Sequence, residues 1–238
     1  MRTVLALFLM TAAALVSVPP LQSLAQGGEV RCLDDAMLVL DASGSMAGTD
    51  LTVQRPHIEK VRAALRDVLP DITLRRHLGL MVYGPGPDRN KCHNIDVRLK
   101  PGPNSTETIM GEVNAVVPAG QTPLTSAVQH AAEELDFRNR PAVVVLLTDG
   151  EETCGGYPCQ LARQLRAAAD DLIIHVIQFK VTGQTWLAPG TGSACMAEET
   201  GGLAITAHDK DELVKALRET LTCPLFSRRE TGTVLPLR

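Results

Sequence analysis

Two stretches of the sequence place carboxylates and hydroxyls where they could bind a metal ion. The apolar run Ala36–Leu40 stops at Asp41. Hydroxyls follow at every second position, Ser43 and Ser45, and a later apolar run stops at Asp149. Two carboxylates brought close together repel each other, which raises their proton affinity or requires a cation. Hard oxygen donors without sulfur or imidazole favour Mg²⁺, with Mn²⁺ or Ca²⁺ as alternatives.

The elements around these residues predict a sheet that brings them together. Ala36–Leu40 and Ala142–Leu147 are continuously apolar, which indicates strands covered on both faces. Strands alternate with helical patterns along the chain, which predicts an α/β fold with a doubly wound, mostly parallel central sheet, one antiparallel edge strand and helices on both faces. Ligands bind such sheets at the carboxyl ends of the strands, so Asp41, Asp149 and the two serines should share one shallow crevice.

The other expected elements follow from periodicity and from the positions of Pro and Gly. The remaining strands are expected at 77–83, 95–99, 172–179 and 203–206, with 95–99 at the edge because its apolar and charged residues alternate. Helices are expected at 58–68, 107–117, 123–135, 161–169, 194–200 and 209–221, the first of them ending before Pro70.

Residues 1–25 have the pattern of a secretory signal peptide. Arg2 precedes an apolar stretch of about fifteen residues, and a small-residue site precedes the expected cleavage after Ala25. A membrane anchor is the alternative, but two prolines interrupt the roughly 20 apolar residues that a spanning helix needs. We therefore expect a secreted or periplasmic protein without membrane insertion after cleavage, with one domain over 32–223 and a C-terminal tail over 224–238.

The composition argues against nucleic acid and against anionic membrane surfaces as partners. The chain has 23 Lys and Arg against 27 Asp and Glu, a formal net charge of −4, and loss of Arg2 with the signal peptide makes it −5. It also has only one Trp, two Tyr and four Phe. Nucleic-acid binding favours a basic face with stacking aromatic side chains, which this chain lacks.

The six cysteines are expected to form disulfides, because their number is even and an exported protein enters an oxidising compartment. One pair brackets a short loop of turn residues, a second flanks the domain and would join its ends, and the third follows by elimination. A zinc site is the rival, but no CxxC pair occurs and the six histidines lack metal spacing. In that order, the expected pairs are Cys154–Cys159, Cys32–Cys223 and Cys92–Cys195.

A family resemblance adds a fifth ligand to the proposed site. D-x-S-x-S after the first strand, Thr122 in a G-x-T-P loop and a strand-ending T-D-G motif together resemble the von Willebrand factor A domain, over nearly all of 32–223. The resemblance implies a metal-ion-dependent adhesion site, and its five ligands would be Asp41, Ser43, Ser45, Thr122 and Asp149.

The resemblance also implies a role for each ligand and a function. The hydroxyl oxygens of Ser43, Ser45 and Thr122 would bind the cation directly, and the two aspartates would hold it directly or through water. Neutral hydroxyls leave the cation under-neutralised, so an Asp or Glu of a protein partner would complete its coordination. The implied function is a non-enzymatic binding module.

Two other functions stay open. A divalent ion with vacant positions can activate water, so a metal-dependent hydrolase acting on an exported substrate is the main alternative. Dehalogenase-type phosphatases carry D-x-D after the first strand, where this chain has Ser43 in place of the second Asp. No Lys lies between Lys100 and Lys180, and no G-x-S-x-G occurs. The third reading is structural: the site is degenerate or serves only to brace the sheet. The same short polar residues could also serve as helix caps.

Four further expectations concern residues near the site or at the end of the domain. Glu151 and Glu152 are expected to be solvated charges at the rim rather than ligands. His175 lies within a predicted strand and is expected to be packed or hydrogen-bonded rather than a ligand. In some members of the family the last helix shifts when the cation gains an anionic ligand. Here Cys223 follows that helix at once, so a bond to Cys32 should restrict the shift.

Overall fold

The computed structural model describes Cys32 and residues 34–49, 55–88, 92–169, 171–179 and 192–223. The expected signal peptide over 1–25 and the expected tail over 224–238 lie outside the described residues.

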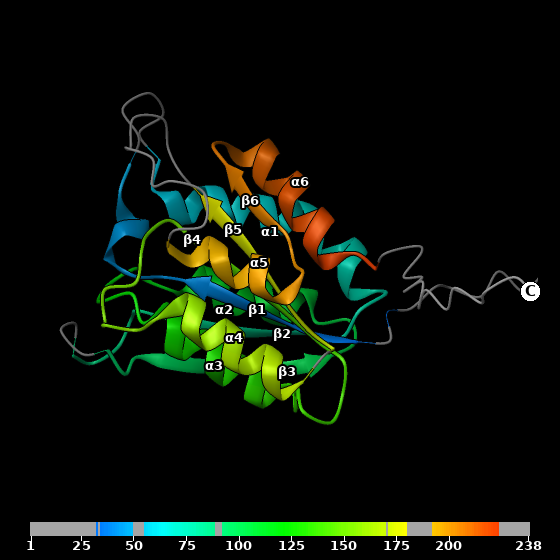
Figure 1. Cartoon of the computed structure of the whole chain (residues 1–238). Helices are drawn as coiled ribbons and strands as arrows, with labels where there is room; N and C mark the ends of the chain where they lie inside the picture. Colours follow the sequence, from blue (N-terminus) through cyan, green and yellow to red (C-terminus); the bar gives the residue numbers. More distant parts are fainter. Residues whose placement is uncertain are drawn as a thin grey trace, which may run out of the picture.

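Six strands form one sheet in the order β3-β2-β1-β4-β5-β6 (Figure 1). The pair β2–β3 is antiparallel and every other neighbouring pair is parallel. The expected α/β fold, including its antiparallel edge strand, is confirmed. The strands are β1 (Asp35–Asp41), β2 (Leu78–Tyr83), β3 (Ile95–Gly102), β4 (Ala142–Thr148), β5 (Leu172–Phe179) and β6 (Ala204–Ala207).

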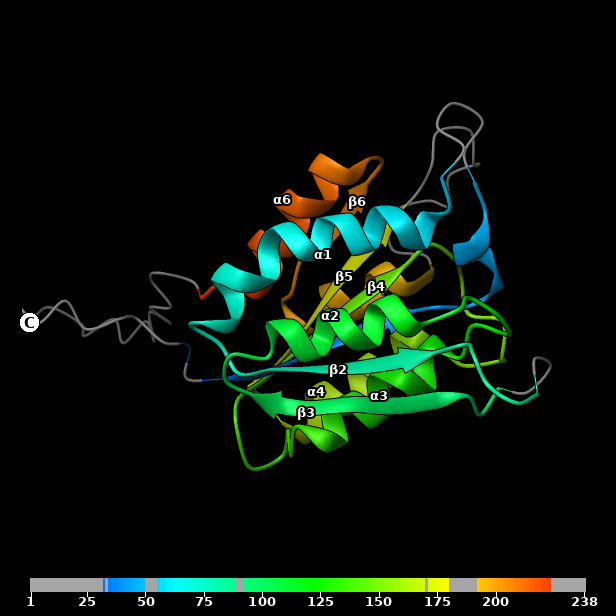
Figure 2. The same ribbon diagram turned by 180° about the vertical axis from the view of Figure 1, so that it is seen from behind.

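Helices cover both faces of this sheet (Figures 1 and 2). Helices α1, α2 and α6 pack on one face, and α3, α4 and α5 pack on the other. Over the described residues the helices are α1 (His57–Thr73), α2 (Thr106–Ala115), α3 (Leu124–Glu134), α4 (Pro158–Ala168), α5 (Cys195–Thr200) and α6 (Lys210–Leu221), with 3-10 turns η1 (Gly44–Ala47) and η2 (Gly192–Ala194).

The continuous apolar run of β1 is explained by its burial on both faces. Leu38 and Leu40 belong to the core under α1 and α6, whereas Met37 and Val39 belong to the core under α3 and α4. All four side chains are fully buried, and each such burial is worth roughly 1.5–3 kcal/mol. The strand that ends at Asp41 is therefore held rigidly from both sides.

Helix α1 continues past Pro70, where the sequence predicted it to end. Proline lacks the N–H that would bond to the carbonyl four residues earlier, here that of Arg66. Both Pro70 and Arg66 are exposed, so water can satisfy that carbonyl. The last turn is retained because Leu69 and Ile72 are buried in the core.

Three disulfides join distant parts of the chain, and only one of the predicted pairs is correct. Cys32–Cys223 forms as expected, whereas the other two bonds are Cys92–Cys154 and Cys159–Cys195. The predicted Cys154–Cys159 pair is wrong because Cys159 lies in the first turn of α4 and is held there by the helix, against the start of the neighbouring α5. Proximity in the sequence does not overcome the direction that a helix gives to a side chain.

His175 of β5 is hydrogen-bonded, as expected, and its environment predicts that stability depends on pH. The backbone N–H of Leu203 donates to its Nδ1 at 3.0 Å, which requires a ring nitrogen without a proton. Burial, and then the charge of Arg76, lower the pKa of His175 from 6.5 to about 4. As the pH falls, His175 is therefore protonated in the unfolded chain before it is protonated in the folded chain. The free energy of unfolding should decrease between pH 6.5 and pH 4 for this reason.

We expect this effect to reach about 2 kcal/mol at pH 4, after allowance for the partial exposure of the ring. Urea denaturation at several pH values would measure it. In His175→Asn the side-chain oxygen can still accept from Leu203 but does not titrate, so its stability should fall less steeply with pH. Parallel curves for the two proteins would assign the pH dependence to other groups.

Candidate metal centre

The carboxyl ends of β1 and β4 lie side by side and carry the two predicted aspartates. Leu40 of β1 is paired with Leu147 of β4, so Asp41 and Asp149 follow at neighbouring points of the same sheet edge. Asp41 is fully buried, and both of its oxygens accept hydrogen bonds. Its Oδ1 accepts from the backbone N–H of Ser43 at 2.8 Å, and its Oδ2 accepts from the hydroxyl of Thr148 at 2.6 Å. The orientation of this carboxylate is thus fixed by the loop after β1 and by the last residue of β4.

The two serines connect Asp41 to Asp149. The loop after β1 turns into η1 at Gly44, which brings the Ser43 and Ser45 hydroxyl oxygens to 3.1 Å from each other. The Ser45 hydroxyl donates to Oδ1 of Asp149 at 2.5 Å. Four of the five predicted residues therefore form one hydrogen-bonded group, drawn from two loops.

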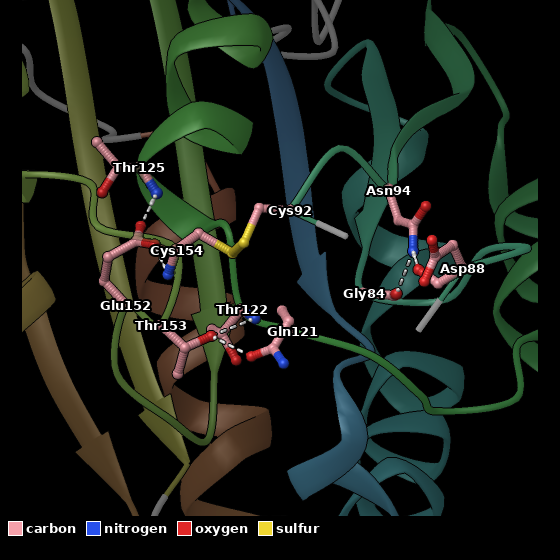
Figure 3. Close-up of a disulfide and its surroundings, with 10 residues drawn as sticks. All are labelled: Gly84, Asp88, Cys92, Asn94, Gln121, Thr122, Thr125, Glu152, Thr153 and Cys154. Carbon is pink, nitrogen blue, oxygen red and sulfur yellow. Dashed lines mark hydrogen bonds between the residues drawn. A yellow bond between two sulfur atoms is a disulfide. The ribbon is translucent and has the colours of Figure 1, made fainter. Parts of the chain in front are cut away.

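Thr122 lies on a third loop that is bonded to the other two. The N–H of Gly44 donates to the carbonyl of Gly120 at 3.1 Å, which joins this loop to the serine loop. On its other side the N–H of Thr122 donates to the hydroxyl of Thr153 at 2.8 Å, and the N–H of Thr153 donates back to the Thr122 carbonyl at 3.2 Å (Figure 3). Thr122 itself is buried, and these two hydrogen bonds to Thr153 are made by its backbone.

The electrostatics of the group fit a divalent cation. Burial, and then the charge of Asp149, raise the pKa of Asp41, so the two carboxylates resist being charged together. Tyr83 is paired with Asp41 across β1 and β2, and burial, followed by the charge of Asp41, raises the pKa of its hydroxyl. In the described part of the chain no three His, Cys, Asp or Glu side chains gather as a metal site, so a cation here would depend on hydroxyl donors. Carboxylate and hydroxyl oxygens are the donor types that Mg²⁺ prefers.

Comparison with known proteins gives the family. A sequence model of the von Willebrand factor type A domain matches residues 36–152, which contain all five predicted ligands. The uncharacterized protein YwmD of Bacillus subtilis (strain 168) is 32% identical over 195 residues, covering 75% of this chain and 81% of that protein. This chain belongs to the von Willebrand factor type A domain family.

Two solved structures share the fold at low sequence identity. The SpRpn10 VWA domain superposes with a TM-score of 0.57 at 13% identity, covering 79% of this chain and 95% of that one. The PilB minor pilin from Streptococcus sanguinis gives a TM-score of 0.58 at 14% identity, covering 79% of this chain and 60% of that one. The family is a protein-interaction fold.

The disulfides bear on where this von Willebrand factor A domain acts. Three disulfides indicate an extracellular or exported protein, because such bonds persist in oxidising compartments. None of the helices in the described ranges is long and apolar enough to cross a membrane.

His57 belongs to the site, although nothing about its position in the sequence indicated this. It is the first residue of α1, and its Nδ1 lies 2.7 Å from Oδ2 of Asp149. The ring is almost fully buried and meets Phe179 edge to face, with 5.7 Å between ring centroids and 87° between planes. The two partners are 92 residues apart in the chain, and no local motif links them.

Glu152 was predicted to be a solvated rim charge, and the structure shows that prediction to be wrong. Its Oε2 accepts from the N–H of Thr125 at 2.8 Å, and its Oε1 accepts from the N–H of Cys154 at 2.7 Å (Figure 3). The carboxylate therefore lies at the N-terminus of α3, where the helix dipole favours a negative charge. Together with the Cys92–Cys154 bond, it fixes the loop that follows Asp149.

Proposed function

We propose that this domain binds Mg²⁺ between Asp41, Ser43, Ser45, Thr122 and Asp149, and that the bound cation docks an Asp or Glu side chain of a protein partner. The observation that carries this proposal is the hydrogen-bonded group of two aspartates and two serines at the adjacent ends of β1 and β4. The third loop, with Thr122, is bonded to both neighbours.

The proposed role of each ligand follows from its charge. Ser43, Ser45 and Thr122 would contribute neutral hydroxyl oxygens, so the two aspartates supply the only negative charge in the set. A cation held in this way keeps an affinity for an anionic group, and a carboxylate of the partner provides one. When bound, the ion supplies a coordination position for that carboxylate. Mn²⁺ and Ca²⁺ also accept oxygen donors and are the alternatives to Mg²⁺.

The proposed location is outside the cytoplasm, either secreted or in a periplasm. The three disulfides support it, and so does the signal-peptide pattern over 1–25 with cleavage after Ala25.

Removal of one hydroxyl tests the proposed ligand set. Thr122→Val keeps the shape of the side chain and the backbone bonds to Thr153, but it lacks the oxygen proposed to bind the cation. We expect the Mg²⁺ dissociation constant, measured by isothermal titration calorimetry, to rise at least about tenfold, which corresponds to about 1.4 kcal/mol.

Thr125→Val is the matched control, because the Thr125 hydroxyl is buried without a hydrogen-bond partner among the described residues. Its Mg²⁺ affinity should equal that of the unmodified protein. If Thr122→Val also bound Mg²⁺ normally, Thr122 would not be a ligand. If the unmodified protein gave no binding heat with Mg²⁺, Mn²⁺ or Ca²⁺, the proposed function would be wrong.

The partner can be sought with the same variants. The domain is immobilised and exposed to secreted and envelope proteins in the presence of Mg²⁺, and the capture is repeated with EDTA and with Thr122→Val. Proteins that dock through the cation should be lost in both controls. Capture that survives both would show a binding surface elsewhere on the domain.

The alternative function, a metal-dependent hydrolase, has one observation in its favour. His57 is a residue type that acts as a general base, and it lies beside a proposed ligand. Its side chain is only 8% exposed and its Nδ1 is bonded to Asp149, so a substrate has little access to it. Hydrolysis of phosphatase or protease substrates by the purified domain with Mg²⁺ would support this alternative.

A further inference from the structure

We infer that His57 is a positioning residue of the proposed metal centre. Its hydrogen bond holds the Asp149 carboxylate in the orientation that faces Ser45 and the cation. This inference rests on the proposed cation binding and adds to it a residue on a helix, outside the three ligand loops.

The contacts of Asp149 show how its orientation is set. Its two oxygens face different partners, with Oδ1 accepting from the Ser45 hydroxyl at 2.5 Å and Oδ2 lying 2.7 Å from His57 Nδ1. The side chains of His57 and Asp149 are only 8% and 1% exposed, so water competes little for these bonds. Without His57, one oxygen of a buried carboxylate would lose its partner, and the plane of the carboxylate would be free to turn.

The ring of His57 is itself held in place from two sides. Phe179, the last residue of β5, meets it edge to face, which is a favoured arrangement of aromatic rings. The backbone N–H of His57 donates to the carbonyl of Gly48 at 2.9 Å, directly after the turn η1 that carries Ser45. A side chain at Gly48 would lie 2.8 Å from the Ser45 carbonyl oxygen, so glycine permits this close approach. His57 thus binds the serine loop through its backbone and Asp149 through its ring.

The expected size of the effect comes from comparable metal sites. Hydrogen-bond partners of metal ligands orient those ligands, and their loss typically weakens metal affinity 10- to 100-fold. If the His57 ring only filled space at the start of α1, its replacement would change the stability of the metal-free domain but not its affinity for the ion. The test therefore has to separate the hydrogen bond from the volume of the ring.

Two substitutions make this separation. His57→Phe keeps a ring against Phe179 and removes the donor to Asp149. His57→Asn removes the ring and keeps an amide N–H close to the position of Nδ1. We expect a Mg²⁺ dissociation constant at least about tenfold higher for His57→Phe, and one within about threefold of the unmodified protein for His57→Asn. Calorimetry with Mg²⁺ alone measures both, and electron paramagnetic resonance of bound Mn²⁺ provides a second readout.

A histidine at the other end of the sheet supplies the control. His77 lies 3.2 Å from Asp35 at the start of β1 and is half-exposed, so His77→Phe breaks a similar pair away from the site and should leave Mg²⁺ affinity unchanged. If His57→Phe fails to fold, His57→Gln replaces it, because its longer side chain carries an amide group that does not match Nδ1. His57→Asn should then bind Mg²⁺ more tightly than His57→Gln.

The outcomes distinguish this inference from the proposed function. Normal Mg²⁺ binding by His57→Phe would overturn the positioning role and leave the proposed function intact. Equal losses in His57→Phe and His57→Asn would overturn it as well, because they would show that the whole histidine, and not its hydrogen bond, is required. Absence of Mg²⁺ and Mn²⁺ binding by the unmodified protein would overturn both.

Discussion

Replacement of Cys32 and Cys223 by serine is expected to lower the free energy of unfolding by about 5 kcal/mol. The bond joins residues 191 positions apart. Its removal frees almost the whole domain in the unfolded state, and the stabilisation from a cross-link grows with the length of the loop that it closes. Guanidinium denaturation measures the change, and the melting temperature should fall by about 10–20 °C.

The Cys159–Cys195 bond is the matched control, because it joins residues only 36 positions apart. Its removal should cost about 4 kcal/mol by the same relation. The Cys32→Ser, Cys223→Ser double variant should keep normal Mg²⁺ affinity, since Cys32 precedes β1 and the proposed metal centre lies at the opposite end of that strand. A loss below about 2 kcal/mol would contradict the loop-entropy explanation.

The same bond bears on the mobility of the last helix. Cys223 follows α6 by two residues and ties its end to the segment before β1. At the start of α6, Lys210 pairs with Asp67 of α1 at 2.7 Å, so both ends of the helix are attached to neighbours. The ion pair is exposed and contributes little, which leaves the disulfide as the stronger restraint. A restricted shift of α6 on ligand binding stays a prediction.

The sequence was informative wherever local pattern and sheet geometry point to the same place. Asp41 and Asp149 could be placed together because parallel strands bring their carboxyl ends to one edge, and Ser43 and Ser45 follow Asp41 within one turn. Thr122 has no such argument from the residues alone. Only the family resemblance pointed to it, because its loop follows α2 and does not directly follow one of the two strands that end at the site.

The failures share one physical cause, which is that side-chain direction depends on tertiary packing. His57 was missed because a helix start and a strand end 92 residues apart carry no common local signal. Cys154 and Cys159 are close in sequence, but the loop turns one toward the β2–β3 connection and α4 turns the other toward α5. Glu152 was misjudged because the N-terminus of α3 was not expected beside it.

Asp41→Asn is expected to raise the stability of the metal-free protein while removing its affinity for Mg²⁺. Burial and the nearby charge of Asp149 raise the pKa of Asp41 above its ordinary value of 3.8, so at neutral pH the charged form is disfavoured by folding. A neutral amide of the same shape removes this penalty. Its oxygen can still accept from the N–H of Ser43, and its NH₂ can donate to Thr148, whose hydroxyl already lies 3.1 Å from the Gly150 carbonyl as an alternative acceptor.

We expect a gain of about 1 kcal/mol, or a melting temperature about 3 °C higher in EDTA, and a Mg²⁺ dissociation constant at least about 100-fold higher. Thermal unfolding with and without Mg²⁺ shows both effects, because only a protein that binds the ion is stabilised by it. Asp35→Asn, at the other end of β1, is the control and should keep the stabilisation by Mg²⁺. Stabilisation by Mg²⁺ that persists in Asp41→Asn would place the ion elsewhere. If the metal-free variant were instead less stable, the negative charge of Asp41 would support the fold without a cation. That result would indicate a purely structural role for these hydrogen bonds. A more stable variant indicates a site that is maintained for binding at a cost in stability.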